Sequence, residues 1–167
     1  KDVAGTTGEL GFAIPLHVAH TARGLPLVGT SIDYFQLRGL TASSGTLPLT
    51  LGDAVLGAQA AHDTGLSVGD RLLTDGERLF AFGLRQPLRL RIVGVLGRRG
   101  TPDDRAVFVD VKTAWVMDGV GHGHVDPRSA APGQVLGQDP KRGTVLDASV
   151  VEAAEINPEN AANVHFH

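Results

Sequence analysis

The 167-residue sequence contains no cysteine and few aromatic side chains, with one tryptophan, one tyrosine and six phenylalanines. Without cysteine the chain can form neither a disulfide framework nor a metal site built from thiolates, and its cellular compartment is left open. No apolar run approaches the roughly 18 residues that a membrane-spanning helix needs. No charged-then-apolar signal sequence opens the chain. We therefore expect this stretch to be soluble by itself, with any membrane anchors outside its limits.

An excess of positive charge is also missing. The formal net charge is −3, which excludes the strongly basic surface that nucleic acids or anionic lipids attract. Arg89 and Arg91 belong to a local group of arginines, but they are two residues apart on a predicted strand. They therefore share the face opposite Leu90 and Ile92. This pattern predicts a solvated strand face, and we expect no nucleic-acid partner.

Glycine, in contrast, is abundant, at 22 of 167 residues, roughly twice its usual share of about 7%. The glycines are spread between apolar segments, which predicts many tight turns between short elements and argues against a helical bundle. The length suits one domain with a real core. Because the only methionine is Met117, the chain lacks an initiator, and we interpret it as an excised or processed piece of a larger protein.

The hydrophobic patterns predict an α+β fold with short mixed strands and small helices. The clearest strands are Leu88–Leu96 and Ala106–Val111, and Ala54–Leu56 reads as a buried strand. Short helices are expected over Ala58–Thr64, ended by Gly65, and from a Ser31 cap to Leu37. A further helix should carry Trp115 and Met117. The core is predicted to contain six aliphatic residues: Val55, Leu56, Leu90, Ile92, Val107 and Val109.

Other segments have weaker patterns. Phe12–Leu16 suggests a short edge strand interrupted by Pro15, and Thr41–Pro48 reads as a polar loop. Lys1–Leu10 is expected to be a loose lead-in, and Asn157–Glu159 a last helical turn. The range Gly119–Thr144, rich in Gly, Pro and His, predicts a long surface loop and the most mobile part of the chain.

We find no catalytic motif, and the chain is predicted not to be an enzyme. It lacks both the phosphate-binding Gly-x-x-x-x-Gly-Lys-Ser/Thr loop and the Gly-x-Ser-x-Gly nucleophile elbow. Asp103 and Asp104 are adjacent, so on an extended segment their side chains point in opposite directions and would not share one substrate. Their position after Thr101-Pro102 suits a turn in which an aspartate binds nearby backbone amides.

Histidines are the one chemically suggestive feature. His122 and His124, followed by Asp126, form one His-x-His pair, and His165 and His167 form another. In an extended segment, residues i and i+2 face the same side, so both imidazoles of a pair can reach one ion. Nitrogen and carboxylate ligands of this kind suit zinc. These five residues are our candidate metal ligands.

His17 and His20 form a third, looser pair, to which the sequence assigns no role. For all three pairs the alternative interpretation is ordinary exposed histidines. Spacing alone favours that interpretation.

Four segments follow one another in a recognisable order, and they are Val28–Phe35, Ala54–Asp70, Leu88–Leu96 and Arg99–Trp115. This order resembles the extracytoplasmic core domain of ABC transporter permeases of the MacB/FtsX type. The resemblance covers Pro26–Trp115 well and the remainder of residues 1–167 loosely. It depends on order and spacing, since its motifs are structural rather than catalytic.

The resemblance implies a non-catalytic domain on the periplasmic or extracellular side of the bacterial cytoplasmic membrane, between the first two transmembrane helices of a permease. The implied partners are the rest of the permease chain, a second permease copy and a cytoplasmic ATPase subunit. Some relatives work with a periplasmic adaptor, which makes one a candidate partner. ATP would bind only to the separate subunit. The chain is short for the complete family arrangement, and the substrate does not carry over.

Two other hypotheses remain open. A free-standing periplasmic zinc-binding module is motivated by the histidine pairs. A small secreted hydrolase would require His62 or His122 to lie beside a serine or a carboxylate in a pocket.

Overall fold

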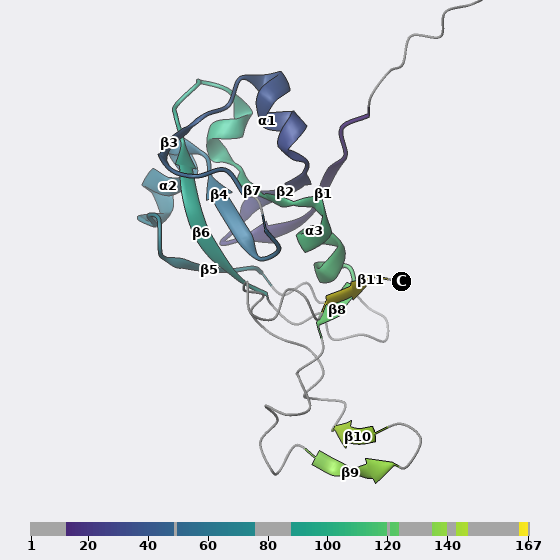
Figure 1. The fold of residues 1–167 in the computed structure, drawn as a ribbon. Helices are drawn as coiled ribbons and strands as arrows, with labels where there is room; N and C mark the ends of the chain where they lie inside the picture. Colours follow the sequence, from purple (N-terminus) through teal and green to yellow (C-terminus); the bar gives the residue numbers. More distant parts are fainter. Residues whose placement is uncertain are drawn as a thin grey trace, which may run out of the picture.

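The structure is a computed structural model, and it describes residues 13–48, 50–75, 88–119, 121–123, 135–139, 143–146 and 164–166. Seven strands form one mixed sheet in the order β1-β2-β7-β4-β6-β3, and β5 pairs with β6 as well (Figure 1). The strands are β1 Leu16–Ala22, β2 Leu25–Thr30, β3 Ala42–Gly45, β4 Asp53–Leu56, β5 Arg71–Leu73, β6 Arg89–Leu96 and β7 Val107–Asp110. The helices are α1 Ile32–Arg38, α2 Ala58–Thr64 and α3 Val111–Met117, with a 3₁₀ turn, η1, at Pro102–Arg105.

The sheet is mixed because β2 runs parallel to β7 and β4 parallel to β6, whereas the other pairs are antiparallel. Two further pairs of short strands lie outside this sheet. One joins β8 (Gly121–Gly123) to β11 (Val164–Phe166), and the other joins β9 (Val135–Asp139) to β10 (Gly143–Leu146). The architecture confirms the predicted α+β class.

Apolar side chains cover both faces of the large sheet. Phe35 of α1 packs on one face, and Ala60 of α2 and Ala114 of α3 pack on the other. All six predicted core residues are at most 1% exposed, so the predicted core is confirmed. Val55 belongs to the α1 face, whereas the other five belong to the face covered by α2 and α3. Among the described residues, none of the helices has the length and apolar character needed to cross a membrane.

The predicted helix ends are confirmed where glycine ends a helix. Gly39 after α1 and Gly65 after α2 have φ values of 62° and 67°, the left-handed region that side chains with a Cβ disfavour. Ser31 precedes α1 as expected, but its side chain does not cap the helix. Its hydroxyl instead bonds to Asp33 at 3.1 Å.

The predicted solvated arginine face is confirmed at Arg89 and in part at Arg91. Leu90 and Ile92 are buried, and Arg89 on the opposite face is exposed. Arg91 makes an ion pair with the buried Asp53 of β4, with its Nε 3.1 Å from Oδ1. In the first half of β6, the alternation therefore places apolar residues on one side and arginines on the other. Further along the strand, Val93 on the arginine side packs against the cluster around Phe35.

Two predictions near the edges of the sheet are wrong. The first strand begins at Leu16, because Pro15 has no backbone N–H to pair with a neighbour. The predicted loop Thr41–Pro48 contains β3, which pairs with the second half of β6 and whose Ser43 hydroxyl donates to the Val95 carbonyl. An edge strand has a solvated side, so its polar composition resembles that of a loop.

The prediction of one long surface loop over Gly119–Thr144 is wrong at β8 and β9 and at the start of β10. The partner of β8 is β11, which lies about 40 residues further along the chain. Such distant pairing leaves no local pattern. Apart from Gly119, the rest of this range lies outside the described residues, as do the lead-in Lys1–Leu10 and the turn at Asn157–Glu159. The mobility of the range stays a prediction.

Candidate functional site

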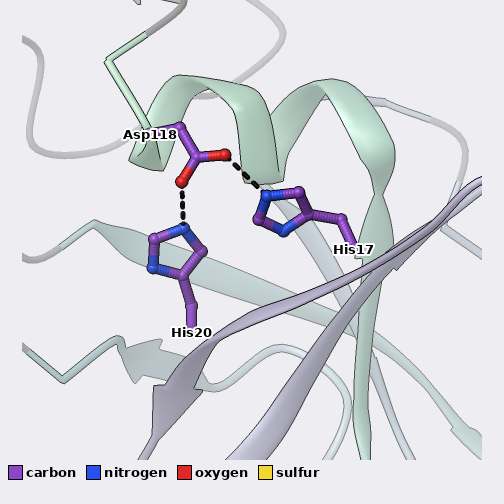
Figure 2. A group of neighbouring side chains, drawn as sticks. All are labelled: His17, His20 and Asp118. Carbon is purple, nitrogen blue, oxygen red and sulfur yellow. Dashed lines mark hydrogen bonds and ion pairs between the residues drawn. The ribbon is translucent and has the colours of Figure 1, made fainter.

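Three side chains from segments about 100 residues apart meet at one edge of the sheet. His17 and His20 come from β1, and Asp118 follows α3 (Figure 2). The Asp118 carboxylate lies between the two rings and presents one oxygen to each. His17 Nε2 is 2.6 Å from Oδ2, and His20 Nε2 is 2.9 Å from Oδ1. We call these three residues the histidine–aspartate cluster.

A β-bulge brings the two histidines onto one face. In a regular strand, residues three apart point to opposite faces. In β1, however, His17 pairs with Gly29 and His20 pairs with Leu27, so Val18 and Ala19 together oppose a single residue of β2. Because positions 27 and 29 share a face of β2, His17 and His20 share a face of β1. The bulge therefore creates the pair.

The β1–β2 turn holds this register in place. Arg23 and Gly24 connect the strands with φ values of 53° and 75°, the positive pair that a two-residue type I′ hairpin requires. Asp75 accepts hydrogen bonds from both of their backbone N–H groups and from the Thr21 hydroxyl. The Gly24 N–H, followed by the Thr21 hydroxyl, lowers the pKa of Asp75. The hairpin is thus fixed by its turn and by a carboxylate from a distant segment.

Gly29 allows α3 to approach this hairpin closely. A Cβ at Gly29 would lie 2.6 Å from the Ala114 Cβ and 3.4 Å from the His17 Cβ. Only a residue without a side chain leaves α3 free to pack at this distance. The close packing places the end of α3, and with it Asp118, over the two histidines.

The surroundings of the cluster favour a positive charge. Asp118 follows the last residue of α3, where the helix dipole already contributes partial negative charge. His20 is 6% exposed, whereas the side chains of His17 and Asp118 are 25% and 20% exposed. Solvent and ions can therefore reach the cluster from the side of His17, while His20 forms its buried base.

The two rings are also close to each other. They stack with centroids 5.6 Å apart and planes inclined by 16°. His17 Nδ1 is buried and has no hydrogen-bond partner among the described residues. Within the described part of the chain, Asp118 is therefore the one polar partner of the His17 ring.

Chemically, the cluster can act in two ways. Its three donor atoms lie within 4.8 Å of one another, so they can surround a metal ion. Without an ion, the carboxylate is hydrogen-bonded to the His20 ring and in ion-pair contact with the His17 ring, and so ties β1 to the end of α3. Both arrangements link segments about 100 residues apart, and they differ in whether protons or a cation lie between the groups.

The five histidine and aspartate ligands predicted from sequence are only partly visible. The β8–β11 register pairs His165 directly with His122, so the backbone brings one residue of each predicted His-x-His pair together. His124, Asp126 and His167 lie outside the described residues. The predicted metal site at these positions stays a prediction.

His62, which we considered as part of a hydrolase site, lies on the surface of α2. Its side chain is 82% exposed, and its Nδ1 is 3.2 Å from the carboxylate of the adjacent Asp63. The nearest described carboxylate is thus a neighbour on the same exposed turn, and the hydrolase hypothesis gains no support from it.

The turn predicted around Asp103 and Asp104 is confirmed. In this segment, Arg99–Arg105, which we call the aspartate loop, Asp104 accepts hydrogen bonds from the backbone N–H groups of Arg99 and Gly100. Asp103 points elsewhere and accepts from the Tyr34 hydroxyl at 2.8 Å and from Arg38 Nη2 at 2.8 Å. The two carboxylates therefore face different partners, as their adjacency predicted.

The hydrogen bonds of Asp103 decide its ionisation. Burial by itself would raise the pKa of Asp103, but the hydrogen bonds from Arg38, Tyr34 and Thr101 together hold it below its usual value. Burial, reinforced by the hydrogen bond to Asp103, raises the pKa of Tyr34. At neutral pH the pair is a carboxylate bound by a neutral phenol.

Sequence reasoning noticed His17 and His20 but did not include Asp118. The period of a regular strand places the two histidines on opposite faces, and nothing in the sequence around Val18 announces a bulge. Asp118 follows a predicted helix as an ordinary polar residue. A local pattern could not have joined them, because the hydrogen bond between His20 and Asp118 spans 98 positions.

No protein-family model matches this chain, and no curated protein matches it.

Proposed function

We propose that this chain is a non-catalytic extracytoplasmic domain of an ABC transporter permease of the MacB/FtsX type. It would couple the cycle of a cytoplasmic ATPase to the handling of a substrate or partner outside the membrane. The observation that carries this proposal is the place of the four resembling segments in the fold. They supply β2, β4, β6 and β7, which are adjacent in the sheet in the order β2-β7-β4-β6. The segments that carry the resemblance thus form one continuous structural unit.

The polar residues of these segments support a mechanical role. The aspartate loop is bound to α1 through Tyr34 and Arg38. It also packs against the start of α2, where a Cβ at Gly57 would lie 2.3 Å from the Asp103 carbonyl oxygen. A loop tied to two helices moves together with them, as a domain that transmits displacement requires.

The path of the chain fits the same role. The first strand, β1, lies at the edge of the sheet, and α3, the last helix of the resembling part, packs against β1 and β2. The first and last helical and strand elements around the resembling range are therefore packed together in one unit.

The proposal includes the partners and the location implied by the resemblance. The domain would lie on the periplasmic or extracellular side of the cytoplasmic membrane, in a permease paired with a second copy, with ATP bound only by the separate ATPase subunit. A periplasmic adaptor is a further candidate partner. The transported substrate is not part of the proposal.

The parent gene gives the first test. Reading outward from both ends should reveal two apolar stretches of about 20 residues that flank this domain. If the parent gene encodes no such stretches, the proposal fails.

Cysteine labelling gives the second test, because this chain has no cysteine of its own. Leu37, which is 67% exposed, is changed to Cys in the full protein, and intact cells are treated with a membrane-impermeant maleimide. We expect labelling without lysis. The matched control Ala60→Cys should stay unlabelled, because Ala60 is fully buried. Labelling of Leu37→Cys only after lysis would contradict the proposed location.

The second candidate function is a periplasmic zinc-binding module that uses the His-x-His pairs. It is favoured by one observation, the direct pairing of His122 with His165 in the β8–β11 register. A double variant, His122→Ala with His124→Ala, tests it by zinc titration beside the unchanged chain. Equal affinity in the two proteins would remove this candidate.

A further inference from the structure

We propose that His17, His20 and Asp118 form a zinc-binding site, separate from the His-x-His segments and independent of the proposed transport function. Two imidazole nitrogens and one carboxylate oxygen are a common ligand set for zinc sites that retain an open coordination position. The three donor atoms already converge, since all lie within 4.8 Å of one another.

Zinc binding would require only modest changes in the distances between the donor atoms. Zinc–ligand bonds of about 2.0–2.1 Å place the ligands of a tetrahedral site roughly 3.3 Å apart. His17 Nε2 lies 2.6 Å from Oδ2 of Asp118, and His20 Nε2 lies 2.9 Å from Oδ1. On zinc binding these nitrogen–oxygen separations would grow by less than about 1 Å. The two nitrogens, at most 4.8 Å apart, would have to settle at roughly 3.3 Å from each other. Rotation of the partly exposed His17 and Asp118 side chains would supply these changes.

The charges and packing around the cluster suit a metal ion. The two rings stack with centroids 5.6 Å apart, which holds both Nε2 atoms beside the same carboxylate. A zinc ion bound to both Nε2 atoms would place its positive charge beside Asp118, at the negative end of the α3 dipole.

The site is organised before any ion binds. The bulge in β1 points both histidines to one face, Asp75 fixes the hairpin turn, and Gly29 lets α3 pack closely enough to deliver Asp118. A ligand set held by packed elements loses little conformational freedom on binding. The partial exposure of His17 leaves a route for the ion and for a water molecule or an external ligand in the remaining position.

The donor set also predicts selectivity. Imidazole nitrogen is a poor ligand for calcium and magnesium, which prefer oxygen donors. We therefore expect zinc to bind in the presence of an excess of magnesium. Copper and nickel should compete with zinc, because they too bind imidazole well.

The test is a titration of the full 167-residue chain with zinc chloride, with a chelating dye as competitor. His17→Ala and Asp118→Asn should each weaken zinc binding by more than about tenfold, since each loses one of three protein ligands. His62→Ala is the matched control, because His62 also lies beside an aspartate but outside the cluster. It should bind zinc as tightly as the unchanged chain. Thermal unfolding of each variant reports whether it has folded.

Two outcomes overturn the proposal. One is equal zinc affinity in the unchanged chain and both cluster variants. The other is a loss of binding only in the double variant His122→Ala, His124→Ala, which would assign the zinc to the His-x-His segments instead.

A measurement without substitutions gives an independent answer should a variant fail to fold. On addition of zinc, the imidazole NMR signals of His17 and His20 should shift together and reach saturation at one ion per chain. Unchanged signals from these two rings at saturating zinc would contradict the site directly. Neither outcome depends on whether the chain belongs to a permease.

Discussion

The aspartate loop and the histidine–aspartate cluster are both polar networks that join distant segments, but they differ in how their donors and acceptors are arranged. In the aspartate loop, Asp103 and Asp104 are buried and accept hydrogen bonds from groups that the fold itself presents. In the cluster, two nitrogens and a carboxylate converge on one point that solvent can reach from the side of His17. The first arrangement holds the fold together, and the second can also hold a ligand.

The two networks also differ in their place along the chain. The aspartate loop lies within Pro26–Trp115, the range that carries the family resemblance. His17 and His20 precede this range, and Asp118 follows it. The residues on which the resemblance is based are therefore not those with the most suggestive chemistry. Substitutions in the aspartate loop should accordingly lower stability, whereas substitutions in the histidine–aspartate cluster should weaken zinc binding.

The largest effect on stability is expected from Asp103→Ala. The substitution removes the acceptor for the Tyr34 hydroxyl and for Arg38, and it should lower the free energy of unfolding by about 2–3 kcal/mol. Arg38 is partly exposed, so its charge stays solvated, which limits the loss. Urea unfolding measures the change, with the exposed Asp63→Ala as control. Zinc affinity should be unaffected, and a large drop in it would show that the two networks are coupled.

Gly29→Ala should lower both the stability of the protein and its affinity for zinc. The new Cβ would meet the Ala114 Cβ at 2.6 Å, so α3 has to shift, at a cost of about 1–2 kcal/mol. The shift moves Asp118 and should weaken zinc binding as well. Gly97→Ala is the matched control, because its new Cβ would meet nothing closer than the Thr41 carbonyl oxygen at 3.8 Å. Unchanged zinc affinity in a destabilised Gly29→Ala protein would show that the position of α3 does not determine the site.

The smallest effect concerns acid pH. The pKa of Asp103 in the folded protein lies below its ordinary value, so its ionised form stabilises the fold at neutral pH. This contribution is lost as the pH falls below about 4. Asp103→Asn keeps the shape of the side chain but removes its titration. The urea midpoints of the unchanged protein and the Asp103→Asn variant, measured from pH 7 to pH 3, should therefore differ most at neutral pH and converge in acid.

Other carboxylates with lowered pKa values, such as Asp70 and Asp75, titrate in both the unchanged protein and the Asp103→Asn variant. The difference between the urea midpoints of these two proteins therefore isolates the contribution of Asp103. A constant difference at every pH would show that the charge of Asp103 contributes nothing to stability.

Much of the central fold followed from local signals. The alternation of Leu90 and Ile92 with arginines predicted β6 and its buried face, and Gly65 predicted the end of α2. These features depend on side-chain period and on the backbone freedom of glycine, which act over a few residues. The edge strand β3 was missed, because the polar residues that suit a solvated edge also suit a loop.

The zinc predicted from sequence was assigned to His-x-His pairs because their spacing is visible in the chain. The cluster had no such spacing. Its histidines are three apart in a strand, a distance that places them on opposite faces unless a bulge intervenes. The bulge becomes visible only in the pairing of β1 with β2.

The sequence alone therefore determined the class of the fold, its core residues and the turn of the aspartate loop, since each depends on short-range pattern. Only the tertiary structure decided that His17 and His20 face the same way and that Asp118 meets them. That meeting depends on the register of β1 and β2 and on the close packing of α3 over Gly29. Both join segments about 100 residues apart, and contacts at such separations leave no trace in local periodicity.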